Sequence, residues 1–200
     1  MFHWLIENYI EIAGAVTGLI YVYFSIRQNI LLWLFGIINA ALYIYVFIVA
    51  KFYAGTGLQA YYLLISVYGW YNWKYGSREN PADKLPVSRL DKKTGITLLL
   101  ISIILFTIIA LVLKNYTDSP VPLGDSFITS LSITATWMLA RKILEHWLVW
   151  IIVDTSAIWL YYCRYLYPTV LLYFIFTIMA ITGFYQWKKS MNPNLHSSEF

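Results

Sequence analysis

The stretch GITLLLISIILFTIIALVL, which spans Gly95–Leu113, contains no charged residue. A helix needs about 20 predominantly apolar residues to cross the hydrocarbon core of a bilayer, so this segment predicts a membrane-spanning helix. The rest of the chain has the same character, because 60% of its 200 residues are hydrophobic and 12% are charged. A soluble domain carries about 25% charged residues. The composition therefore excludes a soluble domain and predicts an all-α membrane protein.

Three further apolar segments lie on each side of this helix. We expect the additional spans at Tyr9–Ile26, Ile30–Ala50, Gln59–Trp73, Phe127–Ala140, Trp147–Cys163 and Thr169–Trp187. The first span does not resemble a cleaved signal peptide, because Glu7 and Glu11 stand where such a leader carries positive charge. The prediction is a single transmembrane domain over residues 1–200, with seven membrane-spanning helices.

The distribution of Lys and Arg predicts the orientation of the chain. If the N-terminus lies outside, eleven of the 14 Lys and Arg fall in inner loops, and only Lys51, Lys114 and Arg164 fall in outer loops. Inner loops carry the excess of positive charge in membrane proteins. Because the number of spans is odd, the C-terminus is expected on the cytoplasmic side.

An internal repeat relates the two halves of the chain. The stretch Gly69-Trp70-Tyr71-Asn72-Trp73-Lys74 closes the third span, and a similar stretch at 183–188 closes the seventh, 114 positions later. The same shift pairs Arg27 with Arg141, Trp33 with Trp147, and Tyr53 with Tyr167. We therefore predict a 3+1+3 arrangement, with a first unit at 9–74, a linker helix at 95–113 and a second unit at 124–188. The odd linker makes the two repeats parallel, and a binding site is expected between them near mid-membrane.

The sixth span carries the strongest site signal. Trp147, Trp150 and Asp154 are spaced i, i+3, i+7 and therefore share one helical face. A carboxylate inside a bilayer costs roughly 2.5–3.5 kcal/mol on insertion scales, so Asp154 is expected to face a cavity or a partner. Two indoles beside an acid suit a flat aromatic cation, on which the rings can stack. The alternative is that both tryptophans are interfacial anchors and that Asp154 bonds to a neighbouring helix.

Further polar residues within the spans extend this candidate site. Asn39 lies one residue out of step with the repeat position of Asp154, Tyr43 follows it by one turn, and Gln59 begins the third span. These residues could supply hydrogen bonds to a ligand, or Asn39 and Gln59 could simply tie helices together. Arg141 and Glu145, at the inner end, are candidates for a gate, although Arg141 also fits a purely topological charge.

Several classes of protein are excluded by what the sequence lacks. One cysteine, Cys163, excludes an internal disulfide, and with only three histidines a metal site is not expected. The small net charge of +4 does not indicate nucleic-acid binding. Asp154 is the only acid deep in a predicted span, whereas an aspartyl protease needs two. We therefore expect neither an enzyme nor a cofactor. Proton coupling through Asp154 stays open.

These motifs resemble the PnuC family of bacterial vitamin transporters over essentially Tyr9 to Lys188. The resemblance is carried by Glu145-His146-Trp147-x-x-Trp150-x-x-x-Asp154, by Gly36-Ile37-Ile38-Asn39, by Gln59 and by Gly69-Trp70-Tyr71-x-Trp73. It implies a SWEET-like fold in the bacterial inner membrane, often a homotrimer. It also implies facilitated diffusion of nicotinamide riboside, which is trapped by phosphorylation in the cytoplasm. By position, Trp147, Trp150, Asp154, Asn39 and Gln59 are the implied binding residues.

Two positions depart from the family pattern. His146 stands where nicotinamide riboside transporters usually carry Asn, and Asp154 stands where many of them carry Asn. Other relatives carry thiamine, which is also a planar aromatic cation. The resemblance therefore leaves thiamine as an alternative substrate.

Overall fold

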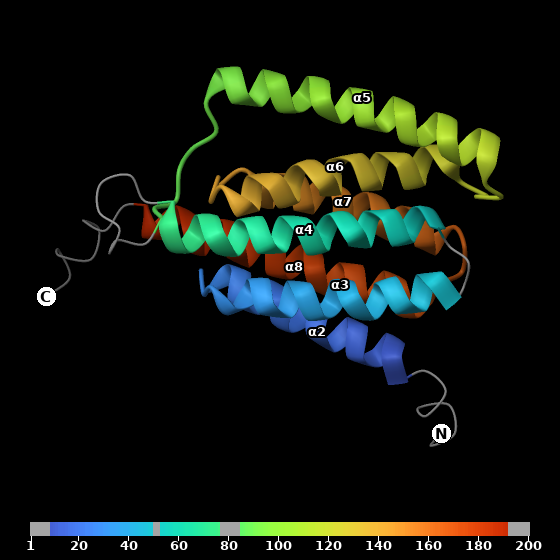
Figure 1. Ribbon diagram of the computed structural model, residues 1–200, viewed down its shortest axis with the longest axis horizontal. Coiled ribbons are helices and arrows are strands. Elements are labelled where there is room, and N and C mark those ends of the chain that lie inside the picture. The colour runs from blue at the N-terminus through green and yellow to red at the C-terminus, as the bar shows by residue number, and fades with distance from the viewer. Residues whose placement is uncertain (1–8, 50–52, 77–84, 192–200) are drawn as a thin grey trace, which may run out of the picture.

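The computed structural model describes residues 9–49, 53–76 and 85–191 (Figure 1). Within these ranges the chain forms seven α-helices and no strand. Their bounds are α2 Tyr9–Ile26, α3 Leu31–Val49, α4 Tyr53–Tyr75, α5 Lys92–Tyr116, α6 Pro122–Ala140, α7 His146–Tyr162 and α8 Tyr167–Ser190. Each predicted span is therefore a helix. Among the loop cations used for the orientation, Lys51, Arg78 and Lys84 lie outside the described residues.

Two helices begin at least five residues earlier than the sequence predicts. α4 begins at Tyr53 instead of Gln59, because its first turns contain small and polar residues that give no apolar signal. α6 begins at Pro122 instead of Phe127. Proline is favoured in the first turn of a helix, where no backbone N–H donor is needed. Pro122 is therefore the first residue of the helix, whereas the prediction placed it before the helix. By length and apolar composition alone, three described helices could cross a membrane, namely α3, α5 and α8.

Six of the helices form a closed bundle, and the seventh lies outside it. Within each half, consecutive helices pack together, α2 on α3 on α4 and α6 on α7 on α8. The halves meet where α4 packs on α6 and where α8 packs on α2. Figure 1 shows α5 along one edge of the bundle, beside α6. The turns α2–α3 and α6–α7 lie at one end of the bundle, and α2 begins at the other.

The 114-residue repeat is visible in the backbone of two turns. Gln28 in the α2–α3 turn has φ 51°, and Lys142 in the α6–α7 turn has φ 52°. Such positive values are uncommon outside glycine. Each turn also places a guanidinium over a ring, that of Arg27 over Tyr23 and that of Arg141 over Trp137. The two turns therefore share one conformation, although few of their residues are identical.

The repeat also governs how tryptophans pack. The indole of Trp33 lies against Gly69, and the indole of Trp147 lies against Gly183, so closely that a Cβ on either glycine would overlap the ring. Trp33 meets Trp73 edge to face with centroids 5.5 Å apart, and Trp147 meets Trp187 in the same way at 5.8 Å.

Two cross-bonds then join the halves. Trp73 Nε1 donates to the carbonyl of Leu139 at 3.2 Å, and Trp187 Nε1 donates to the carbonyl of Ser25 at 2.9 Å. The two donors are 114 positions apart in the sequence, and so are the two acceptors. Each half therefore holds the turn of the other through an equivalent hydrogen bond.

The segment 85–91 before α5, which we call the connector, is bound to the α6–α7 turn. Ser88 N–H donates to the carbonyl of Lys142, and Leu144 N–H donates to the carbonyl of Ser88, both at 2.9 Å. The buried Lys142 ammonium donates to the carbonyl of Leu85 at 2.8 Å and lies over the Trp73 ring. The connector thus adds backbone and charge contacts to one of the two equivalent turns.

Candidate functional site

A cavity of about 1050 Å³ is lined by residues of both halves and, on one side, by residues of α5. All six residues predicted to bind a ligand line it. They are Asn39, Tyr43, Gln59, Trp147, Trp150 and Asp154. Asn39 and Tyr43 come from α3 and Gln59 from α4, whereas the other three come from α7. The structure therefore brings together residues that are more than a hundred positions apart in the sequence.

Asp154 lies in the wall of this cavity and is only 4% exposed. No hydrogen bond or ion pair from another described residue reaches its carboxyl group. A buried carboxylate without a partner carries a large desolvation cost. Its position is therefore explained better by a ligand than by the alternative of a bond to a neighbouring helix.

The two tryptophans of α7 have different surroundings. Trp147 is 3% exposed, and its ring is enclosed by Gly183, His146 and Trp187. Trp150 is only partly buried, and it makes no stacking contact with another described ring. Trp150 is thus the more accessible of the two rings in the cavity wall, while Trp147 is packed among neighbouring rings. Because both line a cavity shared by the two halves, their placement does not fit the alternative of interfacial anchors.

The two amide side chains of the first half differ: Asn39 ties two helices together, whereas Gln59 keeps a free acceptor. Asn39 Nδ2 donates to the carbonyl of Gly14 at 2.7 Å and to Thr17 Oγ1 at 3.0 Å. It therefore ties α3 to α2, and only its carbonyl oxygen remains for a ligand. Gln59 Oε1 is buried and has no hydrogen-bond partner among the described residues. Gln59 thus keeps an acceptor free inside the bundle.

The sequence analysis missed several residues of the cavity. Asp125, in the first turn of α6, lines it and accepts a hydrogen bond from Ser119 Oγ at 2.7 Å. It was missed because Pro120 and Pro122 suggested a loop at this point. Tyr173 also lines the cavity. It is the repeat counterpart of Gln59, so the 114-residue shift was the signal that could have identified it.

The charge of the cavity wall has one sign. Its acidic side chains are Asp125 and Asp154, and no Lys or Arg side chain belongs to the described lining. Tyrosines and small hydroxyl residues supply most of the remaining polar groups, among them Tyr21, Tyr62 and Ser66. Such a wall attracts cations and repels anions.

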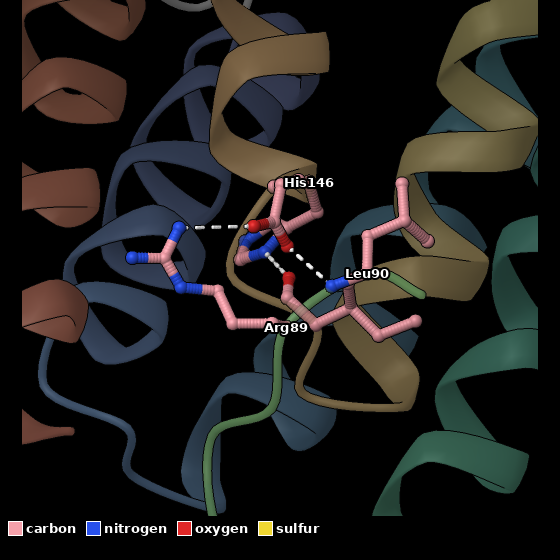
Figure 2. Close-up of polar contacts among 5 residues, drawn as sticks. Arg89, Leu90 and His146 are labelled. Carbon is pink, nitrogen blue, oxygen red and sulfur yellow. Dashed lines mark hydrogen bonds and ion pairs between the residues drawn. The ribbon is translucent and has the colours of Figure 1, made fainter. Parts of the chain in front are cut away.

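The two gate candidates do not pair with each other. Glu145 accepts hydrogen bonds from the Arg89 guanidinium at 3.2 Å and from the backbone N–H of Leu90 at 2.8 Å, as Figure 2 shows. Arg141 donates instead to the Tyr68 hydroxyl at 3.1 Å. Neither residue lines the cavity. Arg89 and Leu90, in the connector before α5, supply the partners of Glu145, and neither residue was predicted from the sequence.

Comparison with known proteins gives consistent similarities. The sequence model of the nicotinamide mononucleotide transporter family matches residues 8–189. The nicotinamide riboside transporter PnuC of Escherichia coli (strain K12) is 26% identical over 206 residues, which cover 92% of this chain and 86% of that protein. The riboflavin/roseoflavin transporter RibM of Streptomyces davaonensis is 22% identical over 88% of this chain and 83% of its own length.

A solved structure has the same fold. The crystal structure of the vitamin B3 transporter PnuC matches with a TM-score of 0.76 and 22% identity, over 96% of this chain and 86% of that one.

Proposed function

Because the chain belongs to the nicotinamide mononucleotide transporter family, we propose that it carries a cationic, water-soluble vitamin across the bacterial inner membrane. Nicotinamide riboside is the proposed substrate. The observation that carries this proposal is the Asp154 carboxyl, buried and without a described partner in the wall of a cavity shared by both halves. Trp150 stacks on the pyridinium ring, Trp147 lines the cavity beside it, and Asp154 neutralises the charge.

The charge of the cavity favours the riboside over the mononucleotide. A phosphate group is bound in proteins by Arg, Lys or clustered backbone N–H groups. The described lining supplies two carboxyl groups and no Lys or Arg, so a phosphate would be repelled. The relative from Escherichia coli is named for the riboside. Riboflavin, for which the Streptomyces relative is named, is neutral and leaves Asp154 without a counter-ion.

We propose that the fold consists of two parallel three-helix units, at 9–74 and 124–188, joined by the linker helix at 95–113. The equivalent turns, glycine contacts and cross-bonds support this arrangement. Transport then proceeds by movement of the two units about the cavity, as in other transporters built from repeats. By resemblance we also propose a homotrimer.

Uptake into liposomes that contain only this protein tests the proposed function. We expect nicotinamide riboside to equilibrate down its gradient, thiamine to enter more slowly or not at all, and nicotinamide mononucleotide and riboflavin to be excluded. The match between one positive charge and the Asp154 carboxyl is the reason to expect exclusion of the anionic mononucleotide and of neutral riboflavin. Thiamine is also a cation, so its uptake relative to the riboside measures what the rest of the cavity selects. Equal uptake of the mononucleotide would contradict the charge argument. Accumulation against a gradient when a pH difference is imposed would replace facilitated diffusion by proton coupling.

The orientation can be tested with Cys163, the single cysteine of the chain. Cys163 is exposed and follows α7 at the end of the bundle opposite the α6–α7 turn. With the N-terminus outside and the C-terminus in the cytoplasm, a membrane-impermeant maleimide should label Cys163 in intact cells. A Cys163→Ser protein that carries Ser88→Cys in the connector is the matched control, and it should be labelled only after permeabilisation. The reverse pattern would invert the proposed topology.

A further inference from the structure

The repeat exposes a difference between two equivalent places in the bundle. In the first half, Trp73 has Leu32 and Leu139 as neighbours. In the second half, Trp187 has His146 and Ser25 at the equivalent positions. The 114-residue shift relates Leu32 to His146, and Ser25 to Leu139. All four residues are buried. Because leucine fills the same positions in the other copy, packing alone does not require a polar side chain at 25 or 146.

Three polar atoms near Trp187 lack partners. Ser25 Oγ, His146 Nε2 and Trp147 Nε1 are buried and have no hydrogen bond within the described part of the chain. The three residues all line the cavity, at the end where the α2–α3 and α6–α7 turns lie. Their common neighbour is Trp187, which bonds to the Ser25 carbonyl and lies 4.7 Å from the His146 ring and 5.8 Å from the Trp147 ring, between centroids. We call these three residues the polar notch.

The hydrogen-bonding capacity of the notch can be read from its atoms. His146 Nδ1 lies 2.7 Å from the carbonyl oxygen of Ile143 (Figure 2). A carbonyl oxygen can only accept, so Nδ1 carries the proton, and Nε2 of the neutral ring is an acceptor. Trp147 Nε1 is a donor, and the Ser25 hydroxyl can act either way. The His146 and Trp147 rings lie 4.5 Å apart between centroids. Together they offer one acceptor and one donor, which matches a hydroxyl group, because a hydroxyl can donate one hydrogen bond and accept another.

We propose that the polar notch binds a neutral hydroxyl group of the transported vitamin, at the end of the molecule remote from its charged ring. This inference rests on the proposed function and adds a specificity-determining contact to it. Trp150 lies about one turn further along α7 than His146, and Asp154 about two turns. A ligand whose ring lies at Trp150 and Asp154 can therefore reach the notch with its other end, and we assign it this orientation. In nicotinamide riboside that end carries the 5′-hydroxyl group.

The test compares nicotinamide riboside with its 5′-deoxy analogue, by calorimetry on the full-length protein in detergent. The wild type should bind the riboside about 5- to 150-fold more tightly, since leaving buried polar groups unpaired costs about 1–3 kcal/mol. His146→Leu, which installs the side chain of the equivalent Leu32, should fold and bind both compounds with equal affinity. Ser25→Ala should reduce the preference in the same direction.

A matched pair of tryptophan variants separates the notch from general packing. Trp33 Nε1 is also buried without a described partner, but Trp33 does not line the cavity. Trp33→Phe should therefore keep the preference of the wild type, whereas Trp147→Phe should lower it. A wild type that binds the two compounds equally would overturn the inference. A preference that survives in His146→Leu would also overturn it. If the wild type binds neither compound, the proposed function fails, and this inference fails with it.

Discussion

Replacing Asp154 by alanine is expected to weaken the binding of nicotinamide riboside by about 30-fold or more. Removal of one partner from a buried charge pair typically costs about 2–5 kcal/mol, and each 1.4 kcal/mol is a factor of ten in affinity. Asp154 is 4% exposed in the cavity wall, so little water is available to replace it. Calorimetry with the purified protein in detergent measures the effect directly.

Thermal unfolding of the same variants provides the control. In the ligand-free protein the carboxyl group has no described partner, so its removal should leave the melting temperature unchanged or raise it. Asp154→Asn keeps the shape and removes the charge, and it should lose most of the affinity for the cationic vitamin. Normal binding by Asp154→Ala would show that the carboxyl does not neutralise the ligand. A large fall in melting temperature would assign Asp154 a structural role instead.

Gly183→Ala is expected to destabilise the bundle and to impair binding together. A Cβ at this position would overlap the Trp147 indole, which also packs edge to face against Trp187 one turn further along α8. Overpacking of this kind typically costs about 1–3 kcal/mol, and the displaced indole belongs to the cavity wall. Unfolding and ligand titration on one preparation measure the two effects.

The repeat supplies a matched variant for this experiment. Gly69→Ala places the same methyl group against Trp33, which does not line the cavity. It should lower stability by a similar amount while the folded fraction binds normally. Gly95→Ala, in the first turn of α5, meets only ordinary contacts with Leu90 and should leave both properties close to those of the wild type. Loss of binding in Gly69→Ala equal to that in Gly183→Ala would contradict a specific role for Trp147.

The sequence predicted the helices well where apolar composition or charge defines them. The span Tyr9–Ile26 is confirmed to the residue, and the family resemblance is confirmed by the match over residues 8–189. The starts of α4 and α6 were wrong because polar and glycine-rich turns give no apolar signal, and because Pro122 fits the first turn of a helix as well as a loop.

The candidate site was predicted in part. The i, i+3, i+7 face of α7 and the repeat identified six residues that line one cavity. Sequence spacing could not reveal that Glu145 bonds to Arg89, because that contact depends on how the connector folds back. Nor could spacing show that Trp147 is enclosed while Trp150 stays open, because the difference arises from Gly183 and Trp187 on another helix.

The cavity wall carries acidic but no basic side chains among the described residues, and this affects the direction of net vitamin transport. A passive carrier lets its cargo return as easily as it enters. A phosphorylated form of the vitamin, however, would meet Asp125 and Asp154 with no Lys or Arg in the described wall to offset them. Such a wall would repel the modified compound electrostatically. Under the proposed function, net uptake would then be driven by metabolism of the vitamin and would need no ion gradient.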